Sequence, residues 1–383
     1  MLFKLRGFFV RIRDMNGVAA RQQAWRLKYY LCTGFMRTYD YILVGQGIAG
    51  TMLGWFLQQA GQQVVVYDDA RPHSASRTAA GIINPVSGRK FEVAWRYDSI
   101  YPFAEQTYRA MEAALQISCF RERDIWNVWP SAQMRDAFAA CPTPYSHQPP
   151  ELRYKEELQQ PFGAGIVKGA NVQLGSLLPA WRKTAEVRAE RFDAGKLALK
   201  ENGVEYEDVQ AKAVIFCEGV ESPLNPWFGK LKFLPNKGEA LIIQLPFPTT
   251  DIIKKSVTLV PLDDAPGMPA EALYWAGATF SWDYTDALPT AAARESLENQ
   301  LKQLLNTGFE VKDHIAAVRP SGPDRRPMAG LHPRIPQVGI FNGMGSKGCS
   351  LAPWAAKAFV DNLLENTPLP PEIDIKRYFN ALR

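Results

Sequence analysis

Residues 41–69 read YILVGQGIAGTMLGWFLQQAGQQVVVYDD and decide the fold of this chain of 383 residues. A run of β-formers leads into three glycines, Gly45, Gly47 and Gly50, spaced as G-x-G-x-x-G. Apolar residues then recur at helical spacing, and the valines at 64–66 begin a strand apolar enough to be buried on both faces. This order of strand, glycine turn, helix and strand predicts the βαβ unit of a Rossmann-like α/β domain.

The same glycine spacing is the fingerprint of a dinucleotide-binding turn. Gly45 permits a tight turn, Gly47 lets the backbone approach a pyrophosphate, and Gly50 lets the helix pack close to the sheet. The amide groups of the helix N-terminus then face the anion. Asp68, which ends the second strand, is expected to accept hydrogen bonds from the adenosine ribose, with Asp69 as the next candidate. The fingerprint serves FAD and NAD equally, because both contain ADP.

Charge and composition exclude several classes of protein. Hydrophobic residues make up 46% and charged residues 22% of the chain, as in a soluble globular protein. No apolar run approaches the ~20 residues that span a bilayer. The net charge of +5 is concentrated in residues 1–35, which hold seven Lys or Arg and one acidic residue. Because the rest of the chain is close to neutral, we expect no nucleic-acid partner.

The basic residues 1–35 have two interpretations. They are a targeting or membrane-surface segment, or an extension that does not belong to the mature protein. We favour a misplaced translation start or a loosely attached extension, because Met36 directly precedes the first strand and a secretory h-region is missing.

Cysteine and histidine usage indicates the compartment and the absence of a metal site. The five cysteines form no C-x-x-C pair, so we expect reduced thiols and a cytoplasmic protein. The four histidines lack metal-ligand spacing, and no metal is expected.

Three further segments combine glycines with a turn. They are SASRTAAGIINP at 74–85, FCEGVES at 216–222 and FNGMGSKGCSLAP at 341–353. Such loops bring backbone amides close to a phosphate or a flavin edge. A flavin is larger than a nicotinamide and needs contacts from distant parts of the chain, which the last segment supplies.

From about residue 38 to the C-terminus, the chain resembles the D-amino-acid-oxidase-like family of FAD-dependent oxidoreductases. TAAGIINP, NKGEALIIQL, WAGATFSWDYTDALPT and NGMGSKGCSLAP are similar to segments of that family. VRPSGPDRRPMAGLHP resembles its R-P-x-x-x-D-x-x-P-x-x-G signature through Arg319, Pro320, Asp324, Pro327 and Gly330. Together these stretches favour FAD over NAD.

The resemblance implies a discontinuous fold. A Rossmann-like FAD-binding domain is expected from residues 36–105, 160–234 and 311–383. A second, α+β substrate domain is expected from residues 106–159 and 235–310, with a mixed or antiparallel sheet that covers the flavin.

The fingerprint and the resemblance together imply a set of cofactor-binding residues. They are Gly45, Gln46, Gly47, Ile48, Ala49, Gly50, Asp68, Asp69, Arg77, Thr78, Ala79, Ala80, Gly81, Gly219, Gly343, Met344, Gly345, Ser346, Lys347 and Gly348. Related sarcosine oxidases anchor the flavin through a cysteine near the position of Arg319. Because this chain has arginine there, we expect FAD to be bound without a covalent bond.

The family chemistry is oxidation of a C–N bond by hydride transfer to the flavin, on a small amine or amino acid such as glycine, sarcosine or a D-amino acid. Arg319 is the expected catalytic residue, because a guanidinium grips a substrate carboxylate with two hydrogen bonds. An ion pair with Asp324 is the structural alternative. Glycine oxidases carry a second arginine where this chain has Ser346, so Lys347 is the other candidate substrate-binding residue.

Three other functions compete with this one. They are flavin-dependent modification of a tRNA wobble uridine, a flavoprotein without catalytic activity, and an NAD(P)-dependent dehydrogenase. The first lacks a basic face, the second is motivated by the missing second arginine, and the third leaves the C-terminal glycine turn unexplained. The sequence leaves open whether oxygen or a quinone accepts the electrons, and what the oligomeric state is.

Overall fold

The computed structural model describes residues 2–5, 8–11, 36–141, 143–262 and 273–381. Strand β1 (Leu2–Leu5) pairs with β2 (Phe8–Arg11) as an antiparallel hairpin. Most of the basic N-terminal segment lies outside the described residues, so its predicted role stays a prediction. In the described part of the chain, no helix combines the length and the apolar character that crossing a bilayer requires.

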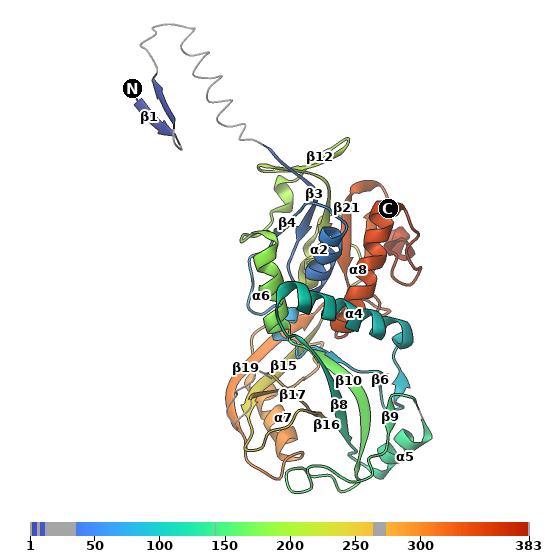
Figure 1. Cartoon of the computed structure of the whole chain (residues 1–383). Helices are drawn as coiled ribbons and strands as arrows, with labels where there is room; N and C mark the ends of the chain where they lie inside the picture. The colour runs from blue at the N-terminus through green and yellow to red at the C-terminus, as the bar shows by residue number, and fades with distance from the viewer. Residues whose placement is uncertain (1, 6–7, 12–35, 142, 263–272, 382–383) are drawn as a thin grey trace.

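The upper half of the molecule is built on an eight-stranded sheet with a parallel centre (Figure 1). Its parallel strands are β11 (Glu186–Arg188), β4 (Val64–Tyr67), β3 (Arg37–Val44), β14 (Val209–Phe216) and β21 (Ile335–Asn342). Its antiparallel strands are β12 (Ala198–Lys200), β13 (Gly203–Tyr206) and β20 (Met328–His332). All four residues of β4 are buried, as expected for a parallel strand covered on both faces.

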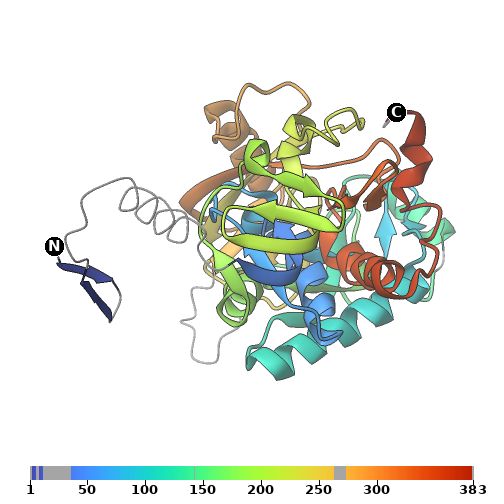
Figure 2. The same cartoon turned by 90° about the horizontal axis from the view of Figure 1, so that it is seen from above.

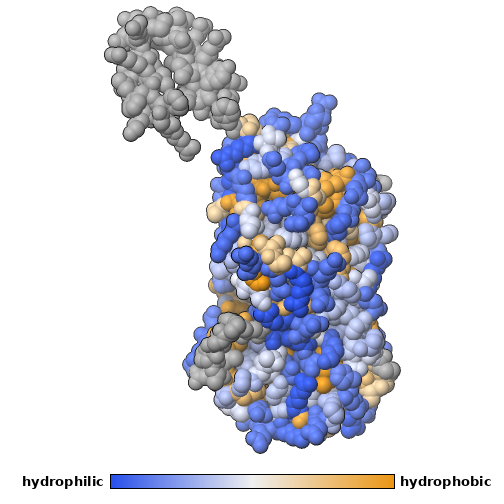
Figure 3. Space-filling model, in the orientation of Figure 1, coloured by the Kyte–Doolittle hydropathy of each residue, from blue (hydrophilic) through white to orange (hydrophobic). Residues whose placement is uncertain are grey.

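Four helices share a hydrophobic core with this sheet: α2 (Ile48–Gln59), α4 (Tyr97–Leu115), α6 (Leu174–Thr184) and α8 (Gly348–Glu365). Figure 2 shows α2, α4 and α8 gathered on the same side of the sheet. On the face shown in Figure 3, the strongest hydrophobic colour lies at the level of α2 and α8. The predicted strand, turn, helix and strand over residues 41–69 are therefore confirmed, and they lie at the centre of this domain.

The lower half is a mixed sheet of nine described strands, among which β16 and β8 are the one parallel pair. Its strands are, in spatial order, β19 (Glu310–Arg319), β15 (Asn236–Gln244), β18 (Leu273–Gly277), β17 (Thr258–Pro261), β16 (Ile252–Lys254), β8 (Phe120–Val128), β10 (Ala164–Val172) and β5 (Ile82–Ile83), with β9 (Ser146–His147) beside β10. Helix α7 (Ala291–Lys302) packs its buried leucines on one face of this sheet.

Short elements complete the described chain. They are α3 (Ala75–Thr78), α5 (Ala132–Ala140), the hairpin of β6 (Val86–Ser87) with β7 (Glu92–Val93), and 3₁₀ helices at Ala194–Lys196, Gly219–Leu224 and Ile375–Ala381.

The sheets suggest different segment boundaries from those expected. Strands β10 and β19 belong to the nine-stranded sheet, although residues 160–234 and 311–383 were assigned to the FAD-binding domain. Helix α4 shares the core of the upper domain up to Met111, beyond residue 105. We therefore propose that the chain crosses between domains after α4, at the start of α6, before β15 and at the end of β19.

Candidate active site

The turn between β3 and α2 is shaped by backbone packing that excludes side chains. Gly45 has a φ of +98°, and a Cβ on it would lie 2.6 Å from the carbonyl oxygen of Cys217. A Cβ on Gly50 would lie only 1.9 Å from the carbonyl oxygen of Gly45. Both positions therefore require glycine, as the fingerprint predicts.

The N-terminus of α2 is open toward an anion. Gly47 occupies the N-cap position and offers no side chain to the first amide groups. The amide N–H of Ile48 donates to Ser76 Oγ, at 2.9 Å, and a Cβ on Gly47 would lie 2.9 Å from the same oxygen. Helix N-termini of this kind bind phosphates, and the Ser76 hydroxyl adds a donor. Ser76 belongs to the loop at 74–85, and nothing in the local sequence singles it out as a phosphate ligand.

Asp68 is held by a network that the sequence did not reveal. Its carboxylate accepts hydrogen bonds from the amide N–H of Gln46 (2.8 Å), the amide N–H of Ala70 (2.9 Å) and Arg182 Nη1 (2.8 Å). Arg182, on α6, also donates to Gln46 Oε1 at 3.1 Å. A carboxylate offers about four acceptor positions. One is left for a ribose hydroxyl, which supports the proposed role of Asp68.

Replacing Arg182 with glutamine is expected to weaken dinucleotide binding by about tenfold or more. Arg182 fixes both Asp68 and Gln46, and charged hydrogen bonds contribute about 1.5–3 kcal/mol each. Fluorescence titration of the apoprotein with FAD measures the effect. Lys183→Gln, at the exposed next position of the same helix, is the matched control. Equal affinities for both variants would show that the network does not position the cofactor.

Glu218 is a partly buried acid next to the glycine turn. It follows Cys217 at the end of β14, and its carboxyl accepts a hydrogen bond from Asn225 Nδ2 at 2.9 Å. Burial raises the pKa of Glu218 above its ordinary value of 4.5, and this outweighs the hydrogen bond from Asn225, which lowers it. The folded state therefore binds this proton more tightly than the unfolded state does.

Glu218→Gln is expected to raise thermal stability at pH 8 but not at pH 4.5. The stability that the neutral carboxyl contributes is present at low pH and is lost as the pH rises through the raised pKa of the folded state. Glutamine stays neutral and still accepts from Asn225. The difference in unfolding temperature between variant and wild type is measured at both pH values, with the exposed Glu201→Gln as the control. An equal difference at both pH values would show that the pKa of Glu218 is not raised in the folded state.

A single cavity of about 1360 Å³ runs from Asp68 to Arg319. This exceeds the ~300–1,000 Å³ of ordinary small-molecule pockets, so a dinucleotide and a small substrate fit together. Predicted residues on its wall are Gly45, Gln46, Gly47, Ile48, Ala49, Asp68, Asp69, Thr78, Ala79, Ala80, Gly81, Gly219, Arg319, Met344, Gly345, Ser346, Lys347 and Gly348.

Three of the predicted cofactor residues do not line this cavity: Gly50, Arg77 and Gly343. Gly50 packs behind the turn, and Gly343 lies against the backbone of Arg326. Arg77 lines a smaller neighbouring cavity of about 430 Å³ and forms an ion pair with Asp68 at 3.6 Å. These residues are placed to support the cavity wall from behind.

One wall of the cavity is a sheet surface made of small residues. Gly238 on β15 pairs with Ala317 on β19, and Ala240 pairs with Gly277 on β18. All four line the cavity. Trp275 closes one end of this surface, and its Nε1 donates to the carbonyl oxygen of Thr78 at 3.0 Å. The small residues at these four positions leave room for a ligand to lie close to the sheet.

Arg319 lies at the end of β19 on the cavity wall, partly buried. Its Nη1 donates to Asn236 Oδ1 at 2.8 Å, and its guanidinium carbon lies 6.0 Å from the centroid of Phe280. A Cβ on Gly238 would lie 2.1 Å from Nη2, so glycine makes room for the guanidinium. Burial lowers the pKa of Arg319. An arginine keeps its charge at neutral pH even so.

The structural alternative for Arg319, an ion pair with Asp324, is not what the structure shows. Asp324 pairs instead with Arg377 Nε at 2.9 Å. Within the described ranges, no carboxylate forms an ion pair with Arg319. Its guanidinium is therefore available to a carboxylate that enters the cavity.

Two cysteine thiols, Cys217 and Cys349, also line the cavity. Burial raises the pKa of Cys217 far above its ordinary value and that of Cys349 to about 12. Because the thiolate is the nucleophile, neither thiol is activated for covalent attachment to a cofactor. The described residues contain no group of His, Cys, Asp and Glu side chains that could hold a metal ion.

Solved structures share this fold at low sequence identity. Iminodiacetate oxidase from Chelativorans sp. is 18% identical, with a TM-score of 0.67, over 87% of this chain and 98% of that one. Glycine oxidase from Geobacillus kaustophilus is 17% identical, with a TM-score of 0.68, over 86% and 95%. L-proline dehydrogenase from P. horikoshii is 15% identical, with a TM-score of 0.67, over 90% and 99%.

The sequence profile of the DAO family, described as FAD dependent oxidoreductase, matches residues 40–362. This range contains the glycine turn, the small-residue sheet surface, Arg319 and the C-terminal glycine turn. The open N-terminus of α2 and the glycine positions fit the dinucleotide that this family binds. The chain belongs to the DAO family of FAD dependent oxidoreductases, and its cofactor is FAD.

Proposed function

We propose that this chain oxidises the C–N bond of a small amine or amino acid, with FAD bound non-covalently. The observation that carries the proposal is the placement of Arg319. Its guanidinium lies beside the small-residue sheet surface without a carboxylate partner among the described residues. A guanidinium in this position binds a substrate carboxylate with two parallel hydrogen bonds. The solved relatives that are named as acting on glycine, iminodiacetate and proline support the same substrate class.

Each part of the cavity has a separate task in the proposed reaction. The α2 N-terminus and Ser76 hold the pyrophosphate, and Asp68 holds the adenosine ribose. The sheet surface with Gly238 and Ala240 positions substrate and ring against one another and excludes water. Arg319 fixes the carboxylate, which orients the carbon that carries the amine.

FAD supplies the redox chemistry when bound: it takes up the hydride equivalent that the substrate carbon loses. The substrate nitrogen gives up a proton to water, and the resulting imine adds water and releases a carbonyl compound together with ammonia or, from a secondary amine, a primary amine. An acceptor then takes up two electrons and two protons: either dioxygen, which becomes hydrogen peroxide, or a quinone, which becomes a quinol. No base is required on the protein, because a neutral amine gives up hydride directly.

Anaerobic reduction of the bound flavin tests the proposal. The purified protein is mixed without oxygen with glycine, sarcosine, D-proline or D-alanine, and the flavin band is followed. We expect at least one compound to bleach the band, and admitted air or added quinone to restore it. Acid precipitation is expected to release all the flavin into solution. A flavin band that no amine or amino acid bleaches would remove the proposed activity.

A further inference from the structure

The cavity wall carries a second group of cations besides Arg319. Arg325, Arg326 and Lys347 all line it, and they come from the two loops at 320–327 and 343–347. In the described part of the chain, none of the three forms an ion pair with a carboxylate. Asp324 is already paired with Arg377. This part of the cavity therefore carries an excess of positive charge.

The two loops that carry these cations are fixed against each other. The amide N–H of Gly345 donates to the carbonyl oxygen of Pro320 at 3.1 Å, and Ser321 forms a β-bridge with Met344. A Cβ on Gly343 would lie 3.1 Å from the carbonyl oxygen of Arg326. Because Pro320 directly follows Arg319, the position of the second group relative to Arg319 is set by backbone contacts.

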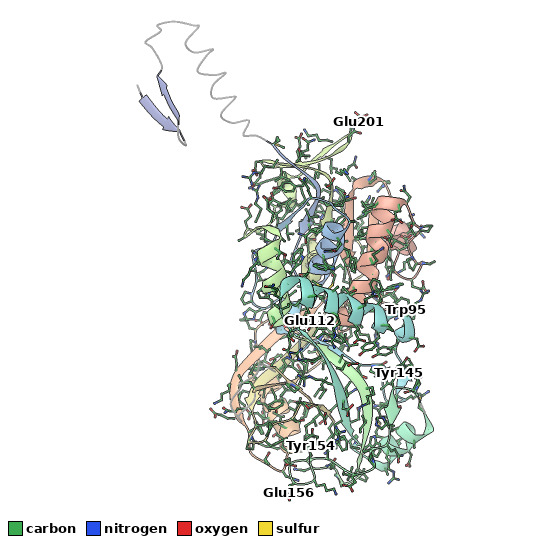
Figure 4. The ribbon with its side chains drawn as sticks, viewed as in Figure 1. Trp95, Glu112, Tyr145, Tyr154, Glu156 and Glu201 are labelled. Carbon is green, nitrogen blue, oxygen red and sulfur yellow. The ribbon has the colours of Figure 1, made fainter. Side chains whose placement is uncertain are left out.

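Arg326 is oriented by an aromatic surface. Its guanidinium carbon lies 4.3 Å from the ring centroid of Trp95, which in turn meets Trp354 edge-on at 5.7 Å. Figure 4 shows Trp95 near the level of α4, where the two halves of the molecule meet. Stacking occupies the face of a guanidinium and leaves its N–H edges for a ligand. Arg96 also lies over Trp95, at 5.2 Å, but unlike Arg326 it pairs with a carboxylate, that of Glu372, at 2.8 Å.

The protein offsets this charge only in part: Arg326 is close enough to Glu372 to help lower the pKa of that carboxyl, but the two form no ion pair. Burial and the nearby Arg326 and Arg325 lower the pKa of Lys347, so the ammonium group is both desolvated and repelled. Three acids lie near this region: Glu92, which lines the cavity from the exposed β7, Glu372, which is paired with Arg96, and Asp324. The pyrophosphate is assigned to the N-terminus of α2, and an oxidised flavin ring is neutral. A second anionic group on a ligand would neutralise the charge of Arg325, Arg326 and Lys347.

We propose that the substrate is an amine with two anionic groups, such as an imino-dicarboxylate or an amino acid with an acidic side chain. One carboxylate binds Arg319 and the other binds Lys347 and Arg326. This inference rests on the proposed function and names its substrate class. Charged hydrogen bonds to the second carboxylate are expected to favour such substrates by about 10–100-fold over monocarboxylates.

Matched compounds that differ by one carboxylate test the inference on the holoenzyme. Sarcosine is compared with iminodiacetate, and alanine with aspartate in both enantiomers, by anaerobic flavin reduction. Malonate and acetate, which lack an amine, are compared by spectral titration of the flavin, which measures binding without turnover. We expect iminodiacetate or one aspartate enantiomer to reduce the flavin at least ~10-fold faster than the matched monocarboxylate does. We also expect malonate to bind at least ~10-fold more tightly than acetate.

Arg326→Met is expected to lower the preference for the dicarboxylate by about tenfold, both in reduction and in malonate binding. Arg294→Met removes an exposed arginine of α7 that pairs with Glu298 at 2.8 Å; it is the control and is expected to keep the preference. Arg326→Lys is expected to restore part of it. A loss of FAD affinity with an unchanged preference would show that the cations serve the cofactor and would overturn the inference. Reduction by monocarboxylates alone would overturn it and leave the proposed function standing, whereas no reduction by any amine would remove both.

Discussion

Gly50→Ala is expected to yield protein without flavin colour, with FAD affinity reduced by at least ~100-fold. The added Cβ would lie 1.9 Å from the carbonyl oxygen of Gly45, which is backbone and cannot rotate away. Helix α2 must therefore move from the sheet, and its N-terminal amide groups move with it. Overpacking of this kind costs about 1–3 kcal/mol or more in stability. Flavin absorbance after purification and FAD titration of the apoprotein measure the two effects.

Gly175→Ala is the matched control for this change. Gly175 lies in the first turn of α6, and a Cβ on it would meet nothing within 4 Å. Alanine at such a helical position stabilises by about 0.4–1 kcal/mol, through the unfolded state. The control is expected to purify with its flavin and to unfold at the same or a slightly higher temperature. A yellow, stable Gly50→Ala protein would contradict the close packing of α2 on the turn.

Arg319→Met is expected to lower kcat/KM for amino-acid substrates by about 10²–10³-fold while FAD remains bound. Removing one partner of a desolvated, hydrogen-bonded charge pair costs about 2–5 kcal/mol, and each 1.4 kcal/mol is tenfold. Arg319→Lys keeps the charge but loses the planar fork, so we expect part of the activity to return. Steady-state kinetics with the best substrate of the panel, together with the flavin content, measure the effect.

Lys312→Met is the matched control, because it tests whether removing any cation from β19 lowers kcat/KM. Lys312 lies on the same strand, and its exposed side chain pairs with Glu310 at 2.7 Å. We expect unchanged kinetics for this variant. An amine without a carboxylate is a second control. It does not bind Arg319, so we expect its kcat/KM to change little in the Arg319→Met variant. Equal losses for both kinds of substrate would show that Arg319 does not bind the carboxylate.

The sequence predicted what depends on neighbours along the chain. The spacing of Gly45, Gly47 and Gly50 determines a local turn, so the fingerprint, the helix that follows and Asp68 could be placed without coordinates. Arg319 was found through the family signature rather than through any local pattern. Arg319 lines the cavity, and its role in binding a substrate stays a prediction.

Contacts between distant segments could not be predicted from the sequence. Arg182 forms a hydrogen bond with Asp68, 114 residues away in the sequence, and Trp275 forms one with Thr78, 197 residues away. Gly238 lies opposite Ala317 because β15 pairs with β19, and the pattern along either strand alone does not tell which distant strand it pairs with. The domain boundaries depend on such contacts too, because the sequence of β10 is compatible with a buried strand in either sheet.

The parallel sheet of the upper domain is completed by β21, whose partner β14 is more than a hundred residues earlier in the chain. During synthesis, the N-terminal part of a chain emerges first. The nascent protein therefore holds the βαβ unit long before the strand and the loop at 343–348 that close the cavity exist. We therefore expect FAD to bind only after most of the chain has been synthesised. A truncated translation product would lack the loop at 343–348 and could not retain the flavin.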